Sequence, residues 1–386
     1  MYQAFEQALS QAVSEGRIAG AAALVCDRDG VTYQHAGGRR SVSGEVAMDA
    51  ATVFWIASMT KAITSIAALQ LAERGKLSLD GPLTALLPDL AELQVLEGFD
   101  DQGAPRLRPA RRAPTLRQLL THTSGFAYGF TSADLAAYGQ TPGAVDPNGG
   151  TRAAQRQPLL FDPGEGWIYG IGIDWAGLAV EVASGQRLDA YFAENILEPL
   201  GMGDTGFALT AEREARRAGM HVRGPDGALV PIPFAMPIEP EVLSGGGGLY
   251  STVSDYGRFL RALLNRGRLD GVQVLSAELV DSLGEVQTGA ERVGAGKSAM
   301  ANLANDFDLI PGRHTGHGLA TLIAAEGSDH GRQPGSLAWA GLGNTYYWAD
   351  PAAGIAGVLM TQLLPFADPQ VLGLFAALER GAYGNA

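Results

Sequence analysis

The sequence has little of two reactive residue types, cysteine and lysine. Its single cysteine, Cys26, excludes an internal disulfide, and the apolar run around it favours a place in the core over a nucleophilic role. Only three of the 28 basic residues are lysines, at positions 61, 76 and 297. Because arginine supplies nearly all the positive charge, Lys61 is an unusual residue within its apolar segment.

Clustered positive charge and long apolar runs are also missing. The net charge is −13, and the basic residues form no cluster beyond the short run Arg106–Arg112. Nucleic acid and anionic membranes are therefore poor candidates for a partner. No apolar run approaches the ~20 residues that a spanning helix requires. The first residues lack the basic start and apolar core of a secretory signal, so we expect a cytoplasmic protein.

The two ends of the chain share one pattern, strand-like runs beside an amphipathic helix. At the start, Phe5, Leu9 and Val13 share a helix face. We expect strands at 19–26, 31–36, 336–341, 344–349 and 355–362, and a last helix at 369–380. The predicted fold class is α/β (α+β), with one antiparallel sheet built from both chain ends and flanked by the terminal helices.

The middle of the chain favours a mostly helical part. Helices are predicted at 58–74, 115–120, 174–184, 188–197, 254–265 and 276–283. The predicted division is a sheet domain of residues 1–70 and 330–386 and a helical domain of residues 71–329. Two stretches rich in Gly, Pro and Ala, 129–163 and 219–240, are too long for simple connectors, so we expect them to line or cover a site.

A serine and a lysine stand three residues apart in Ser58–Lys61, at the start of an apolar helical run. Residues at this spacing lie on one helix face, so the hydroxyl and the amine are within reach of each other. Burial disfavours the charged form of an amine, which prepares Lys61 to accept a proton. The alternative, a surface lysine on an amphipathic helix, fits poorly with apolar residues on every side.

Two further segments are candidates for the same site. Tyr169 follows the Pro163–Gly164 turn and precedes a predicted helix, and near an ammonium its phenolate would be favoured. A half-buried core tyrosine is the simpler alternative. Trp339 lies on a predicted strand that ends at Gly341, where a backbone amide can approach a substrate closely. From spacing alone, a core role for Trp339 is favoured.

Other site chemistries find less support. A Ser-His-Asp hydrolase is disfavoured because the chain has no G-x-S-x-G elbow, and we interpret His122 as structural. A metal centre is disfavoured because its possible ligands lie in a Gly-rich run that is typical of a loop. Those possible ligands are Asp306, Asp308, His314, His317 and His330. No metal and no other cofactor is expected. One alternative stays open, a non-catalytic binding protein that is acylated once and does not turn over.

Motifs in this order resemble the serine β-lactamase and penicillin-recognising superfamily, and within it the class C β-lactamases and the family VIII carboxylesterases. The first motif, Ser58–Lys61, matches S-x-x-K, and the others follow over nearly the whole chain. They are 116–125, a stretch typical of this branch; 163–169, similar to P-G-x-x-x-x-Y; 199–202, P-L-G-M; and 246–252, similar to G-G-L-x-S-T.

Two departures from the superfamily pattern bear on the substrate. Y-x-N places an amide where this chain has Ile171, and K-[ST]-G places a cation where it has Trp339. Losing the anchor for a β-lactam carboxylate typically costs a few kcal/mol, whereas an indole offers apolar area to acyl groups. Lys297 does not supply the missing cation, because it lies in a Gly-rich loop well before the C-terminal strands. The resemblance to family VIII therefore implies ester substrates.

The resemblance implies acyl transfer in two halves, with Ser58 as nucleophile and Lys61 and Tyr169 together as its base. The backbone amides of Ser58 and Leu342 would hold the oxyanion. The predicted function is a serine carboxylesterase for small or medium esters. The alternatives are an acyltransferase to an alcohol, or a β-lactamase or D-amino-acid peptidase with weak cephalosporin hydrolysis.

The expected partner is a small-molecule ester, and the sequence leaves the oligomeric state open. From their positions, the predicted substrate-binding residues are Trp339, Gly341 and Ile171, with Tyr128, Phe130 and Phe234 from the two long loops.

Overall fold

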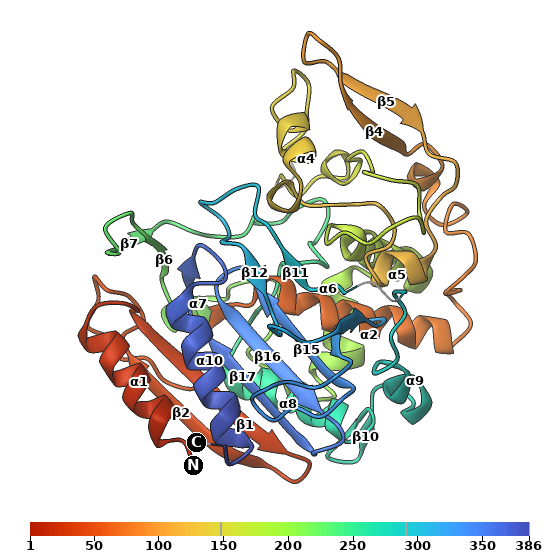
Figure 1. Cartoon of the computed structure of the whole chain (residues 1–386). Helices are drawn as coiled ribbons and strands as arrows, with labels where there is room; N and C mark the ends of the chain where they lie inside the picture. The colour runs from red at the N-terminus through yellow and green to blue at the C-terminus, as the bar shows by residue number, and fades with distance from the viewer. Residues whose placement is uncertain (147–148, 290–291, 386) are drawn as a thin grey trace.

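A seven-stranded antiparallel sheet forms the centre of the computed structural model, which describes residues 1–146, 149–289 and 292–385 (Figure 1). Its strand order is β13-β14-β15-β16-β17-β1-β2, so the first strand of the chain lies directly beside one of the last. The strands are β1 (Gly20–Asp27), β2 (Val31–Gly38), β13 (Thr315–His317), β14 (Leu322–Ala324), β15 (Ser336–Gly341), β16 (Thr345–Asp350) and β17 (Ile355–Met360). The predicted sheet from both chain ends is confirmed.

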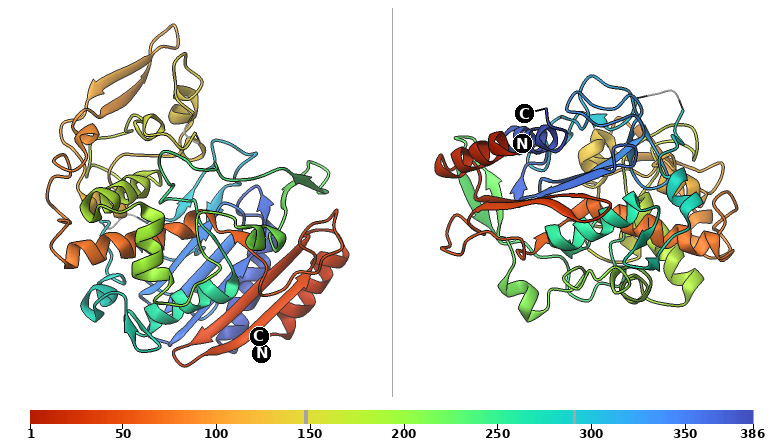
Figure 2. Two further views of the ribbon diagram at one scale, coloured as in Figure 1. Left: turned by 180° about the vertical axis from the view of Figure 1, so that it is seen from behind. Right: turned by 90° about the horizontal axis from the view of Figure 1, so that it is seen from below.

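Helices cover both faces of this sheet. The terminal helices α1 (Gln3–Ser14) and α10 (Pro369–Ala382) lie side by side on one face, and α8 (Val253–Leu264) packs on the other (Figure 2). Phe5 and Leu9 of α1 are buried, as the helical spacing predicts. Two apolar clusters result, one under the terminal helices and a larger one shared with the helical part.

The sheet also takes in two strands that lie before residue 330, the boundary expected from the sequence. β13 and β14 each have three residues and are separated by a Gly-containing turn. Strands this short carry too few residues for a period-2 pattern to stand out. The division into two domains stays a prediction.

The helical part contains α2 (Thr60–Glu73), α3 (Leu116–Leu120), α5 (Gly172–Ser184), α6 (Leu188–Phe192) and α9 (Ala277–Ser282). These helices agree with the predicted ranges, although α6 is shorter and continues as a π-helical turn, η5 (Ala193–Leu197). Every residue of α2 from Thr60 to Leu71 is buried. A surface position for Lys61 on an amphipathic helix is thereby excluded.

The long loops hold more regular structure than the sequence indicates. The stretch 219–240 contains a hairpin of β6 (Met220–Arg223) and β7 (Leu229–Ile232), whose turn is closed by a bond from Ala228 N to Asp226 Oδ1 of 3.0 Å. A second hairpin, β4 (Gln94–Phe99) and β5 (Pro105–Pro109), projects from the helical part (Figure 1). Neither hairpin is predicted by the sequence, because strands of four to six residues that contain or adjoin Pro or Gly resemble loops.

The remaining elements are short. They are β3 (Phe54–Trp55), η1 (Ala57–Met59), η2 (Pro88–Ala91), η3 (Gly129–Thr131), α4 (Ala133–Tyr138), η4 (Ala153–Gln155), α7 (Ala211–Ala215), β8 (Tyr250–Ser251), β9 (Arg268–Leu269), β10 (Val272–Gln273), β11 (Ala295–Gly296), β12 (Phe307–Asp308) and β18 (Leu363–Leu364). Throughout the described ranges, none of the helices has the length and apolar character needed to cross a membrane.

Candidate active site

Ser58 lies on the one-turn helix η1, between β3 and α2. The residue before it, Ala57, has a φ of 45°, in the left-handed region. For a residue with a β-carbon this conformation costs about 1–2 kcal/mol, so the surrounding structure must impose it. β3 supplies part of that constraint by pairing with β8. The sharp turn leaves Ser58 half-buried while its neighbours are fully buried.

Lys61 is 1% exposed, and its Nζ donates three hydrogen bonds. They reach Ser58 Oγ at 3.1 Å, Tyr128 OH at 2.9 Å and Gly246 O at 2.5 Å. An ammonium has three donors, so the charged form is fully satisfied here despite its burial. The contact with Ser58 is the one that the S-x-x-K spacing predicts, although the catalytic roles of both residues stay predictions.

Two tyrosines, not one, flank the lysine. Tyr169 meets it through its ring, with Nζ 4.9 Å from the ring centroid, and the Tyr169 hydroxyl makes no hydrogen bond to a described residue. Tyr128 instead makes the direct bond to Nζ. Burial, and then the nearby Asp174 and Tyr169, raise the pKa of Tyr128 well above its usual range. The sequence indicated only a pocket-lining Tyr128, because no local spacing links it to Lys61.

An aromatic wall stands beside Tyr169. The ring of Trp339 lies 5.0 Å from that of Tyr169, His122 lies 4.8 Å from it, and Phe130 lies 6.2 Å from it, all between centroids. His317 completes the wall at 5.0 Å from His122. Trp339 is 6% exposed, so it is a core residue and also a neighbour of the candidate site.

The other predicted substrate-binding residues are spread more widely. A β-carbon on Gly341 would lie 2.3 Å from Ile56 O, so the end of β15 presses against the segment that leads to Ser58. Leu342 follows directly and is half-buried. Ile171 is buried at the start of α5. The Phe234 ring lies 4.4 Å from that of Trp55 at a tilt of 42°, and among the described residues it makes no ring contact with Tyr169.

Two buried, neutral histidines, His122 and His317, make the stability of the folded state sensitive to acid. Burial lowers the pKa of His317 to about 4, and burial together with His317 and Lys61 lowers that of His122 well below its usual range. His317 Nδ1 donates to Gly318 O at 2.7 Å. Within the described chain, neither ring nitrogen of His122 has a hydrogen-bond partner. Both rings are therefore held in the neutral form.

We expect the free energy of unfolding to fall as the pH drops from about 6.5 toward 4. In this window the histidine is protonated in the unfolded state, whereas His317 stays neutral in the folded state. The unfolded state therefore binds more protons than the native state, and acid stabilises it. The slope is about 1.4 kcal/mol per pH unit for each such histidine. Urea unfolding between pH 7.5 and 4.5 measures it. His317→Gln should flatten the curve and His314→Gln should not; equal slopes would contradict the assignment.

The loop that carries Tyr169 is clamped by arginines from the predicted basic run. Arg108 donates to both carboxylate oxygens of Asp162, at 2.8 and 3.2 Å, and Arg111 N donates to Oδ1 at 2.7 Å. Arg112 Nε donates to Pro163 O at 2.6 Å. The hydrogen bonds from the Arg108 side chain and the Arg111 backbone lower the pKa of Asp162 to about 2. The run is thus satisfied within the chain and holds the turn that begins the Tyr169 loop.

Asp162→Ala should loosen this turn and lower turnover about ten- to a hundredfold, because a displacement of about 1 Å at a catalytic group is that costly. Steady-state kinetics with a chromogenic ester, together with the melting temperature, measure the effect. Arg111→Ala is the matched control, since it keeps the backbone N–H that binds Asp162 and should change turnover only a few-fold. Full activity in Asp162→Ala would show that the clamp does not position Tyr169.

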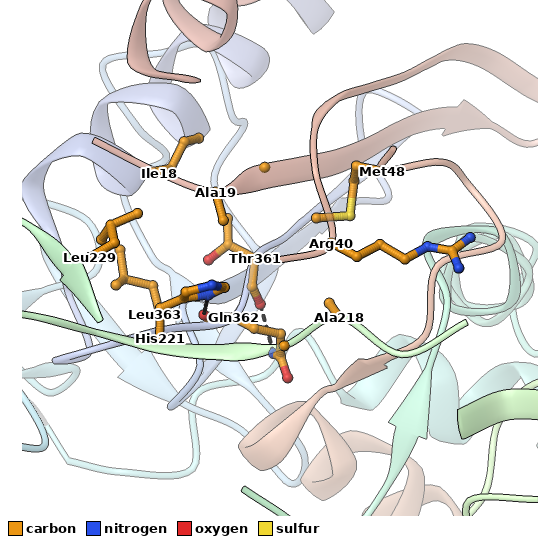
Figure 3. Close-up of a pocket in the computed structure, with 12 residues that line it drawn as sticks. Ile18, Ala19, Arg40, Met48, Ala218, His221, Leu229, Thr361, Gln362 and Leu363 are labelled. Carbon is orange, nitrogen blue, oxygen red and sulfur yellow. Dashed lines mark hydrogen bonds between the residues drawn. The ribbon is translucent and has the colours of Figure 1, made fainter. Parts of the chain in front are cut away.

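A small cavity lies away from Ser58, between the start of β1 and the β6–β18 pair (Figure 3). Its volume of about 10 Å³ is near the lower limit for one water molecule and far below that of a substrate pocket. Gln362 on its wall bonds Trp55 N at 3.1 Å and Trp55 O at 3.0 Å. This side of the molecule therefore anchors β3, the strand that leads to Ser58.

The metal-ligand candidates lie apart in the structure. His317 belongs to the aromatic wall, whereas His330 Nδ1 lies 3.8 Å from Glu379 Oε2 under α10. Among residues 1–146, 149–289 and 292–385, no group of three or more His, Cys, Asp or Glu side chains is arranged to hold a metal ion.

Comparison with known proteins places these features in context. The family model described as Beta-lactamase matches residues 5–380. Monacolin J acid methylbutanoyltransferase of Aspergillus terreus is 35% identical and aligns with 98% of this chain and 95% of its own length. Lovastatin esterase of Penicillium rubens is 35% identical over 87% of this chain and 86% of that protein. A mutant simvastatin synthase from Aspergillus terreus superimposes with a TM-score of 0.86 at 35% identity, covering 98% and 94% of the two chains.

Proposed function

The chain belongs to the β-lactamase family, and from that premise we propose that it is an acyl-transfer enzyme that takes an acyl group from a carboxylic ester onto Ser58. The observation that carries this proposal is the buried Lys61, whose Nζ lies 3.1 Å from Ser58 Oγ and 2.9 Å from Tyr128 OH. A nucleophile, a basic group and a proton-carrying hydroxyl thus form one connected set.

In the first half-reaction Lys61 acts in its neutral amine form, which has a lone pair: Ser58 Oγ attacks the ester carbonyl and its proton passes to Lys61 Nζ. The new Oγ–C bond forms, and the bond to the leaving alcohol breaks as that oxygen takes up a proton. Tyr169 is the proposed donor of this proton, because its hydroxyl is free of other partners in the described chain, and the proton that Lys61 took from Ser58 then restores the tyrosine hydroxyl. The backbone N–H groups of Ser58 and Leu342 are the proposed oxyanion donors.

Esters are the proposed substrates rather than β-lactams. The two positions at which the superfamily binds a β-lactam hold Ile171 and Trp339, and both side chains are buried and apolar. The carboxylate of a β-lactam would find no cation to bind at these positions, whereas an acyl chain would gain contact with apolar side chains. The proposed partner is accordingly a small-molecule ester, and the finer likeness to family VIII carboxylesterases stays a prediction.

The acceptor in the second half-reaction is proposed to be an alcohol in addition to water. The relative that aligns with 98% of this chain is named as a methylbutanoyltransferase, and the one that aligns with 87% is named as an esterase. We therefore propose transfer of a short branched acyl group to the hydroxyl of an apolar acceptor. The second candidate is the plain carboxylesterase, in which water alone completes the cycle.

A substrate panel tests these proposals. p-Nitrophenyl esters of graded acyl length, nitrocefin and D-alanyl amides are offered to the wild-type protein, with and without an added apolar alcohol. We expect turnover of short acyl esters, little or no reaction with the other two classes, and a transesterified product that grows with alcohol concentration. Hydrolysis that is unchanged by alcohol would favour the carboxylesterase, and a stoichiometric burst without turnover would indicate a binding protein.

A further inference from the structure

A buried carboxylate, Asp174, is linked to the lysine of the candidate site through a single residue, Gly246. It lies in the first turn of α5 and is 4% exposed. Its Oδ1 accepts two hydrogen bonds, from Ser244 Oγ at 2.8 Å and from Gly246 N at 2.9 Å. The carboxylate therefore faces the 244–246 segment, which leads into the Gly-rich motif 246–252, and not the solvent.

The peptide units at Gly246 connect this carboxylate to Lys61. Gly246 N is held by Asp174, and Gly246 O accepts from Lys61 Nζ at 2.5 Å. On the other side, Thr64 Oγ1 of α2 donates to Gly245 O at 2.6 Å. A β-carbon at residue 246 would lie 2.3 Å from Asp174 Oδ2, so only glycine allows this approach. The position of the carbonyl that binds Lys61 thus depends on Asp174.

The negative charge of Asp174 has a second effect, which is electrostatic, on Lys61. Lys61 is a cation buried among apolar residues, and buried cations persist only where opposite charge and hydrogen bonds compensate them. In the described part of the chain, the ionisable groups packed around Lys61 are Tyr128, Tyr169, His122 and His317, and both histidines are held neutral. The negative charge of Asp174 reaches this group, since it helps to raise the pKa of Tyr128.

We propose that Asp174 is a positioning residue for Lys61: its carboxylate fixes the Gly246 carbonyl that binds Nζ, and its charge stabilises the ammonium form of the resting enzyme. The catalytic consequence rests on the proposed function, because it requires Lys61 to serve the acylation of Ser58. The structural claim does not, and it can be measured without turnover.

The low lysine content makes a direct test possible. With 13C-labelled lysine, the chain has three Cε signals, and Lys76→Arg and Lys297→Arg identify the signal of Lys61. Its chemical shift is followed with pH in the wild type and in Asp174→Asn, which keeps the size of the side chain and an oxygen that can accept from Gly246 N. Loss of the negative charge should move the titration midpoint of Lys61 to lower pH.

Kinetics then separate charge from hydrogen bonding. In Asp174→Asn the acidic limb of the kcat/KM profile for a short ester should move to lower pH together with the lysine midpoint, with little change in KM. Ser244→Ala removes the other hydrogen bond to Asp174 Oδ1 and keeps the negative charge. The acidic limb of its kcat/KM profile should therefore stay at the wild-type pH, even if the rate itself changes. If Asp174→Asn fails to fold, the smaller Asp174→Ser replaces it in both measurements.

The outcomes are distinguishable. An equal Lys61 midpoint in the wild type and in the folded Asp174 variant would overturn the positioning role, even if the enzyme is fully active. A shifted midpoint in a protein that turns over no ester would support the role of Asp174 and would refute the proposed function alone. A shift of the same size in Ser244→Ala would assign the effect to hydrogen bonding and would also overturn the charge role.

Discussion

Replacing Ser58 by alanine should abolish the acyl-enzyme and lower ester turnover by a factor on the order of 10³ to 10⁶, because removal of a catalytic nucleophile leaves only binding and oxyanion stabilisation. Intact-protein mass spectrometry after mixing with a p-nitrophenyl ester measures the first effect. The wild type should gain the mass of one acyl group and the variant none. Steady-state rates with the same ester measure the second effect.

Ser65 supplies the matched control for this experiment. It lies on the same buried helix, α2, and its Oγ has no hydrogen-bond partner in the described chain. Ser65→Ala removes a serine hydroxyl, as Ser58→Ala does, but should keep turnover within a few-fold of the wild type. Acylation of Ser58→Ala at the wild-type rate would move the nucleophile to another residue and refute the proposed function.

Replacing Tyr169 by phenylalanine is expected to have the next largest effect, a loss of about 10² to 10⁴ in kcat. The predicted cause is the missing proton donor for the leaving alcohol. The loss should therefore be larger for an ethyl ester, whose alkoxide needs that proton, than for a p-nitrophenyl ester, whose phenolate leaves without it. Rates of Tyr169→Phe on the two esters of one acid provide this comparison.

Tyr128→Phe gives the contrasting case. Its hydroxyl bonds Lys61 at 2.9 Å, so its loss should disturb the lysine and slow both esters to a similar degree. Tyr138→Phe, a half-buried tyrosine on α4, is the control and should be near wild type. If the leaving-group effect appears in Tyr128→Phe and is missing from Tyr169→Phe, the two tyrosines exchange their proposed roles.

Much of the fold could be predicted from local patterns. The terminal strands are short runs rich in apolar residues, the terminal helices have a clear period of 3.6 residues, and the pairing of the strands into one sheet is confirmed. β13, β14 and the β6–β7 hairpin could not be predicted in the same way, because strands of three or four residues have no resolvable period and owe their shape to neighbouring strands. Tertiary contact, and not propensity, makes them strands.

The candidate site divides in a similar manner. The sequence by itself determined that Ser58 and Lys61 share a helix face, since a spacing of three residues has one geometry in a helix. It also determined the absence of a cation and an amide at Trp339 and Ile171. Tertiary structure alone decided which groups meet Lys61. Tyr128 and Gly246 are 67 and 185 positions away, and Asp174 acts through the Gly246 peptide. Contacts at such separation depend on how α2, α5 and the Gly-rich segment pack, and no local pattern encodes that packing.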